Sequence, residues 1–220
     1  MKKARINLIC SAVLLLLFIV FTLCVMTVDV APAGFEGSKL GFSKLNKAAY
    51  DSIGKNSYFA KPSDAFMMVA IIAAAVFAVI GHVQLIKRKK FLKVDPDILF
   101  LGAVYILVVV FYGVFEVAAI NFRPEAAEAS YPSSHTFIVI TVAVTAAMFA
   151  ARKIKDKKIY IAIYVICISA AALTAICRLC SGEHWTTDII GGALLGSALA
   201  TLYAGLTAYI DYRNDNGGSK

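Results

Sequence analysis

The chain alternates between long apolar runs and short polar connections. Six such runs stand at residues 6–28, 65–86, 98–120, 134–151, 159–176 and 186–210. About 20 apolar residues in a helix suffice to cross the hydrocarbon core of a bilayer. The pattern therefore predicts an all-α, polytopic membrane protein with six transmembrane helices, and we expect residues 1–220 to form one domain. Small residues give the last run a smooth face for close helix packing: Gly191, Gly192, Gly196, Ala198 and Ala200.

The connection at residues 29–64 is long and has a helical period of its own. Apolar residues recur there against lysines and an aspartate: Phe42, Leu45, Ala48, Ala49 and Ile53. We expect a short amphipathic helix at the membrane interface between the first two spans, serving either as a brace or as a lid. An alternative for the first run is a cleaved signal peptide, because Ala31-Pro32-Ala33 is similar to a small-residue cleavage site.

Composition supports a membrane protein. Of the 220 residues, 60% are hydrophobic, against about 45–50% in soluble domains. The formal net charge is +8, and its cations cluster at residues 2–5, 87–93 and 152–158, beside the apolar runs. This pattern predicts that both termini and these connections face the cytoplasm of a cell membrane. Without a basic helix face or an aromatic-basic motif, the charge does not make nucleic acid an expected partner.

The stretch before the last run, residues 177–188, places an arginine, a histidine and a carboxylate between two apolar segments. If the chain is helical from Trp185, His184 and Asp188 lie on one helix face, so the carboxylate can orient one imidazole nitrogen and leave the other free. This is the base-and-orienter half of a catalytic triad. We expect Arg178, on the loop turned by Gly182, to offer a planar guanidinium that binds phosphate oxygens.

Two other junctions carry similar chemistry. Arg123 follows the third run, and Pro132-Ser133-Ser134-His135 precedes the fourth. With six spans, all three junctions fall on the extracytoplasmic side, as a common site requires. Two arginines would repel a divalent cation and suit an oxyanion, so the set of residues does not imply a metal.

The remaining chemistry-bearing residues of this stretch have simpler interpretations. Cys177 and Cys180 have the spacing of a redox site, but no βαβ pattern surrounds them. A structural disulfide between them is an alternative if the loop is extracytoplasmic. Trp185 is expected to anchor the chain at the membrane interface.

From about Leu99 to the C-terminus, these motifs resemble the type 2 phosphatidic acid phosphatase superfamily, the membrane lipid phosphate phosphatases related to vanadium haloperoxidases. The match lies in Arg123, in Pro132-Ser133-Ser134-His135 and in Arg178-x5-His184-x3-Asp188. Three positions depart from the family pattern, which has lysine, glycine and serine where this chain has Glu116, Ser134 and Cys177.

The resemblance implies a hydrolase that works without cofactor or metal at the extracytoplasmic face. His184 would form a phosphohistidine, Asp188 would hold its tautomer and His135 would protonate the leaving group, while the phosphate would be bound by Arg123, Arg178, Ser133 and Ser134. The expected substrate is a lipid phosphate in the bilayer: a polyprenyl diphosphate such as undecaprenyl diphosphate first, then phosphatidic acid or phosphatidylglycerol phosphate. Alternatives are a lipid-linked phosphotransferase and a catalytically impaired lipid-binding or transport protein.

Glu116 is the main departure, because a carboxylate there would repel phosphate unless it is protonated or paired. Its expected role is to orient Arg123 or Arg178. The alternatives are that it binds hydroxyl or amine groups of a lipid headgroup, or that the enzyme is impaired. Three further carboxylates near the mouth of the expected site, Glu125, Glu128 and Glu183, are interpreted as solvated loop charges.

Overall fold

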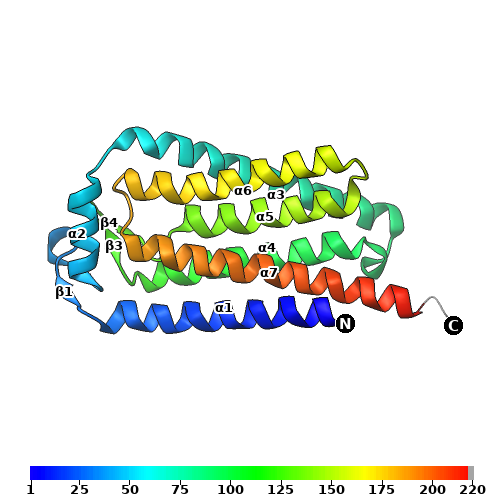
Figure 1. Ribbon diagram of the computed structural model, residues 1–220, viewed down its shortest axis with the longest axis horizontal. Coiled ribbons are helices and arrows are strands. Elements are labelled where there is room, and N and C mark those ends of the chain that lie inside the picture. The colour runs from blue at the N-terminus through cyan, green and yellow to red at the C-terminus, as the bar shows by residue number, and fades with distance from the viewer. Residues whose placement is uncertain (218–220) are drawn as a thin grey trace.

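The computed structural model describes residues 1–217 and confirms the helical membrane architecture (Figure 1). Within these residues, six helices are long and apolar enough to cross a membrane. Their bounds are α1 (Lys2–Thr27), α3 (Ala60–Arg88), α4 (Pro96–Ala118), α5 (Ser134–Lys153), α6 (Lys157–Cys180) and α7 (Thr186–Gly217). The predicted amphipathic helix is α2 (Ser43–Ile53), which lies across one end of the bundle.

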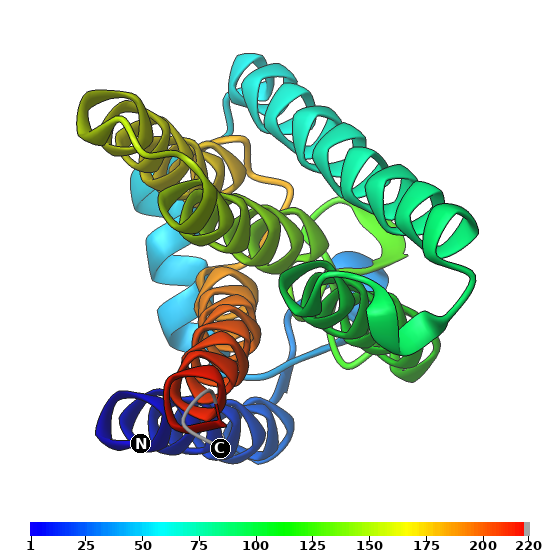
Figure 2. The same ribbon diagram turned by 90° about the vertical axis from the view of Figure 1, so that its right-hand side faces the viewer.

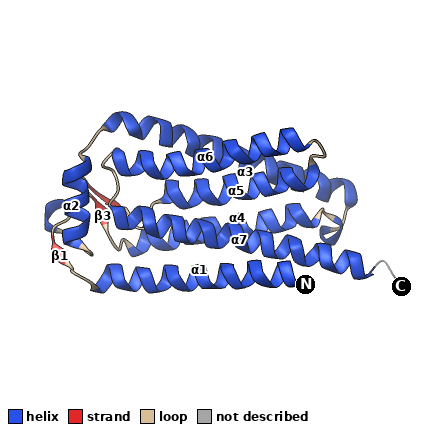
Figure 3. Ribbon diagram, in the orientation of Figure 1, coloured by secondary structure: helices blue, strands red, loops and turns tan. Residues whose placement is uncertain are grey.

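Short strands (red in Figure 3) and 3₁₀ turns, which the hydrophobic pattern did not predict, complete the connections. β1 (Ala31–Pro32) pairs with β2 (Lys39–Leu40), and β3 (Phe122–Arg123) pairs with β4 (Ala126–Ala129), both antiparallel. Three 3₁₀ turns are η1 (Phe35–Gly37), η2 (Ser57–Phe59) and η3 (Phe91–Lys93). Strands of two to four residues are too short to show the alternation that identifies a strand in a sequence.

Helix starts follow local capping chemistry. The Asp95 carboxylate accepts a hydrogen bond from the Asp97 N–H at the start of α4, and Asp156 accepts one from Lys158 at the start of α6; each satisfies a backbone donor that the helix leaves free. Asp64, the last residue before the second apolar run, does not cap the second span, because α3 already begins at Ala60. The Asp64 side chain is thereby left to make contacts outside its own helix.

α7 packs between α1 and α5, as the end-on view shows (Figure 2). The expected smooth face on α7 is confirmed: a Cβ at Gly191 would come within 2.6 Å of the Tyr131 ring, and one at Gly196 within 2.9 Å of Ile140. On the other side, the Ser11 hydroxyl of α1 donates to the Ala198 carbonyl at 2.8 Å. Close backbone approach therefore places α7 at the centre of the bundle.

The two ends of the bundle have different chemistry. At the end where α1 begins and α7 ends (Figure 1), Arg152 of α5 binds Asp211 of α7 at 2.6 and 2.8 Å and Asp97 of α4 at 2.9 Å. These ion pairs join three helices where the predicted cytoplasmic connections lie. The three motif junctions all meet at the opposite end, beside α2, as the six-span count requires.

Candidate active site

His184 lies in the turn before α7 and is only 3% exposed. Its Nδ1 is 3.5 Å from Oδ2 of Asp188, and neither ring nitrogen has a hydrogen-bond partner among residues 1–217. The helix begins at Thr186, so the two residues face each other across the helix start rather than along one helix face. The imidazole is buried beside a carboxylate with its hydrogen-bonding capacity unused, which is costly unless a ligand uses it.

The Asp188 carboxylate is fully buried and fixed by two donors. The Trp185 N–H donates to Oδ2 at 3.0 Å, and the Asn121 side-chain amide donates to Oδ1 at 3.2 Å. The Asp188 carbonyl also accepts from the Ser133 N–H at 3.0 Å. Asp188 therefore links all three motif junctions, because Asn121 precedes the Arg123 strand and Ser133 precedes α5.

Arg178 and His135 are in direct contact. Arg178 is 2% exposed and lies in the last turn of α6, not in the loop as predicted. Its Nη2 is 2.6 Å from Nδ1 of His135. Asp64 approaches both groups, with Oδ1 3.1 Å from Nε2 of His135 and 3.2 Å from Nη2 of Arg178. Sequence reasoning missed Asp64, although a lone carboxylate at the start of an apolar run is a signal for a functional charge.

Arg123 lies on β3 and faces the same region. Its Nε is 3.2 Å from Oε2 of Glu128, and its Nη1 is 3.5 Å from Oε2 of Glu183. Glu183 also pairs with Nη1 of Arg178. One carboxylate thus contacts both guanidinium groups, so the two arginines are close enough to bind a single anion. Glu183, with a side chain 29% exposed and two arginine partners, is not the solvated loop charge that we expected, whereas Glu128 pairs with Arg123 but stays 64% exposed.

The two serines of the second motif have different surroundings. Ser133 is fully buried, and its Oγ accepts a hydrogen bond from Thr136 at 3.0 Å. Since its backbone N–H is used by Asp188, only the hydroxyl proton of Ser133 remains to be donated to a ligand. Ser134, the first residue of α5, lines a pocket together with His184.

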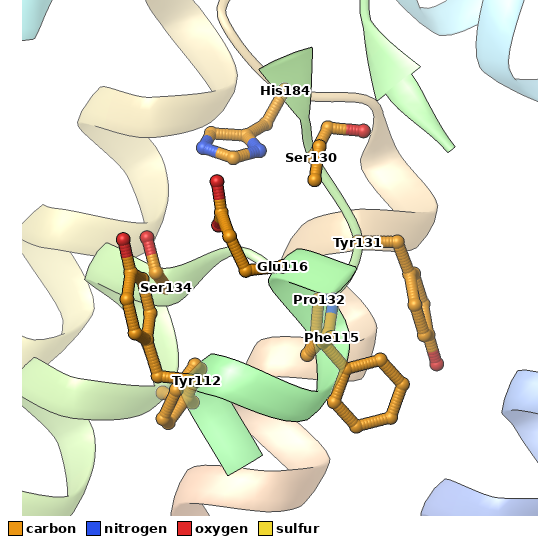
Figure 4. A pocket seen from close by; sticks show the side chains of 10 residues that line it. Tyr112, Phe115, Glu116, Ser130, Tyr131, Pro132, Ser134 and His184 are labelled. Carbon is orange, nitrogen blue, oxygen red and sulfur yellow. The ribbon is translucent and has the colours of Figure 1, made fainter. Parts of the chain in front are cut away.

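That pocket also contains Glu116 (Figure 4). The Glu116 carboxylate points toward the His184 ring, and Tyr112, Ser130 and Ser134 also line this pocket. Among residues 1–217, Glu116 makes no ion pair with any arginine. The expectation that it orients Arg123 or Arg178 is therefore wrong.

Helix α2 holds the α7 start from outside the bundle. The fully buried Asn46 donates to the Thr187 hydroxyl at 2.9 Å and accepts from the Thr187 N–H at 3.2 Å. Trp185 is 4% exposed and donates through Nε1 to the Phe122 carbonyl at 2.8 Å, and its ring packs on Tyr50. Trp185 is therefore a buried contact, not the interfacial anchor that we expected, and α2 acts as a brace.

Glu125 completes this brace by accepting hydrogen bonds from Lys55 and Tyr50. The hydrogen bond from Lys55 is the main reason that the pKa of Glu125 is lowered. Burial, followed by the hydrogen bond to Glu125, raises the pKa of Tyr50 to about 12. Both side chains therefore keep their protonation states at neutral pH. Cys177 and Cys180 are free thiols, so the structure does not contain the disulfide considered above.

Comparisons with known proteins agree with the fold and with the region of the chain that contains the motifs. Residues 108–212 match the model of the PAP2 superfamily. A crystal structure described as the first transmembrane PAP2 type phosphatidylglycerolphosphate phosphatase from Bacillus subtilis has the same fold, with a TM-score of 0.68 and 19% identity over 96% of this chain and 98% of that chain.

Curated relatives align over a shorter region. Phospholipid phosphatase-related protein type 1 of Xenopus tropicalis is 34% identical over 92 residues, which are 40% of this chain and 28% of the relative. Undecaprenyl-diphosphatase of Sulfolobus acidocaldarius is 34% identical over 80 residues, 36% of this chain and 34% of the relative. The chain thus spans about a third or less of these relatives' lengths.

Proposed function

We propose that the protein is a membrane lipid phosphatase that hydrolyses a lipid phosphate monoester or diphosphate, because residues 108–212 match the model of the PAP2 superfamily. The observation that carries the proposal is His184. It is a buried imidazole with both nitrogens unpartnered, beside the fixed carboxylate of Asp188. Two arginines that share one anionic partner lie in the same part of the bundle.

Phosphoryl transfer requires an in-line nucleophile, a proton for the leaving oxygen and cations around the equatorial oxygens. In our proposal, His184 attacks phosphorus through Nε2 while Asp188 keeps the proton on Nδ1, so the P–O bond to the leaving group breaks as the P–N bond forms. His135 gives a proton to the departing oxygen. Water then attacks the phosphohistidine, and His135 takes its proton.

The phosphate oxygens would be bound by Arg123 and Arg178 during both steps. The hydroxyls of Ser133 and Ser134, from the second motif, would donate further hydrogen bonds to the phosphate oxygens. The guanidinium of Arg178 is only 2% exposed. It should therefore bind the phosphate more strongly than Arg123 does, since charge-assisted hydrogen bonds strengthen as water is excluded.

The proposed substrate is a lipid whose phosphate reaches the bundle end that carries α2. The basic connections at residues 87–93 and 152–158 lie at the other end, which supports an extracytoplasmic site in a cell membrane. A polyprenyl diphosphate is our first choice, and phosphatidic acid and phosphatidylglycerol phosphate follow. The names of the relatives from Sulfolobus acidocaldarius and Bacillus subtilis support this substrate class.

The test is inorganic phosphate release from a panel of these lipids in detergent, with EDTA present. We expect release to continue with EDTA and to be abolished by His184→Ala, whereas His82→Ala, which changes an exposed histidine of α3, should keep it. Release that persists in His184→Ala would refute the proposed nucleophile. Release that stops with EDTA would refute metal independence.

A second candidate, a non-catalytic lipid-binding or transport protein, is favoured by the Glu116 carboxylate that faces His184 in the pocket. A binder should show no phosphate release for any lipid of the panel and should keep most of its lipid affinity in His184→Ala.

Product analysis with labelled lipid separates hydrolysis from transfer of the phosphoryl group to another hydroxyl.

A further inference from the structure

Glu183 occupies the position between the two arginines. Its Oε2 pairs with Nη1 of Arg178 and lies 3.5 Å from Nη1 of Arg123. A carboxylate and a phosphate offer similar paired oxygens to a guanidinium fork. We propose that Glu183 is an internal competitor of the phosphate group: it holds both guanidinium groups when the site is empty and thereby sets the affinity for phosphate. This inference rests on the proposed function for the identity of the bound anion.

Glu183 is distinguished from the other carboxylates by what it contacts. Glu128 pairs with Arg123 alone and has a side chain that is 64% exposed, while Asp64 pairs with Arg178 and His135 and is 58% exposed. The Glu183 side chain is 29% exposed and contacts both arginines. It is thus the residue that a phosphate bound to both arginines must displace.

The charge of the site gives the same conclusion. Two guanidinium groups are in contact with three carboxylates, Asp64, Glu128 and Glu183. The net charge of this cluster is −1 with His135 neutral and 0 with His135 protonated, as the proposed first step requires. An arriving phosphate dianion therefore meets no excess of positive charge. Displacement of Glu183 from the arginines exposes two cations to the phosphate, and its return after hydrolysis opposes rebinding of the product.

Apparent affinity falls in proportion to the fraction of molecules in which the site is open. If Glu183 holds the arginines in about nine molecules of ten, its neutralisation should tighten phosphate binding about tenfold. A neutral amide competes less well than a carboxylate for a guanidinium group, because hydrogen bonds between charged partners are about twice as strong as neutral ones.

The experiment measures the binding of inorganic phosphate to the full chain in detergent by calorimetry. We expect Glu183→Gln and Glu183→Ala each to lower the dissociation constant about tenfold. The control Glu128→Gln removes a carboxylate that contacts one arginine at an exposed position, so its effect should stay within about twofold. In turnover assays, Glu183→Gln should lower KM and strengthen product inhibition by phosphate.

Unchanged or weaker phosphate binding in both Glu183 variants would overturn the inference, and so would an equal gain in Glu128→Gln. Tighter binding in the Glu183 variants of a protein that hydrolyses no lipid phosphate would support the inference and refute the proposed function. If the protein hydrolyses lipid phosphate but phosphate binding is unchanged in the Glu183 variants, the proposed function is supported and this inference is refuted.

Discussion

Asn46 provides the sharpest test of how the fold supports the site. This side chain of α2 is fully buried, although α2 lies at the end of the bundle. It donates to the Gly41 carbonyl at 2.8 Å and to the Thr187 hydroxyl at 2.9 Å, and it accepts from the Thr187 N–H at 3.2 Å. Thr187 is adjacent to Asp188, so these bonds hold the start of α7 where the His184–Asp188 pair lies.

Asn46→Ala removes three hydrogen bonds and leaves the buried groups of Gly41 and Thr187 without their partner. At about 1 kcal/mol for each bond, the variant should lose about 3 kcal/mol of stability. The assay is unfolding of the protein in detergent, induced by denaturant or by heating. Phosphate release is measured in parallel. We expect a lower midpoint of unfolding. We also expect kcat to fall by a larger factor than KM changes, because the proposed nucleophile, His184, is displaced.

The matched control is Lys47→Ala, the next residue of α2, whose side chain is exposed. It should stay within about 0.5 kcal/mol of the wild type. If Asn46→Ala is as stable and as active as Lys47→Ala, the brace does not hold the site, and the reasoning from these three hydrogen bonds is refuted.

Three further predictions test separate features. Asp188→Asn should lower kcat about 10⁴-fold without unfolding the chain, because the amide cannot hold the required tautomer; phosphate release by the folded variant checks this. Tyr50 has a pKa raised from 10.0 to about 12, so its contribution to stability is complete below pH 10 and is lost as pH rises through 12. Raising the pH from 8 to 11 should therefore lower the melting temperature of Tyr50→Phe less than that of the wild type. Gly191→Ala should cost about 1–3 kcal/mol, since its Cβ would overlap a tyrosine ring, whereas Gly113→Ala on α4 meets nothing within 4 Å and should be neutral or stabilising in the same melts.

The helical architecture could be predicted because its cause is contained within each segment. A run of about 20 apolar residues can satisfy its backbone in a bilayer only as a helix. The parity of six spans then places the three motif junctions at one end, as Figure 1 shows. Helix ends were less predictable, because they depend on polar residues: α6 continues past its last apolar run to Cys180 and so includes Arg178.

The contacts that complete the candidate site could not be predicted in the same way. Asn46 and Thr187 are 141 positions apart, and Asp64 and His135 come from different helices. A polar residue in a connection has no period that reveals its partner, so its role is decided only when the helices have packed. Glu183 shows the consequence: from the sequence it is one of several acidic loop residues, and in the fold it contacts both arginines. Residue types and spacing therefore predicted an anion site, but which carboxylates contact its arginines depends on tertiary structure.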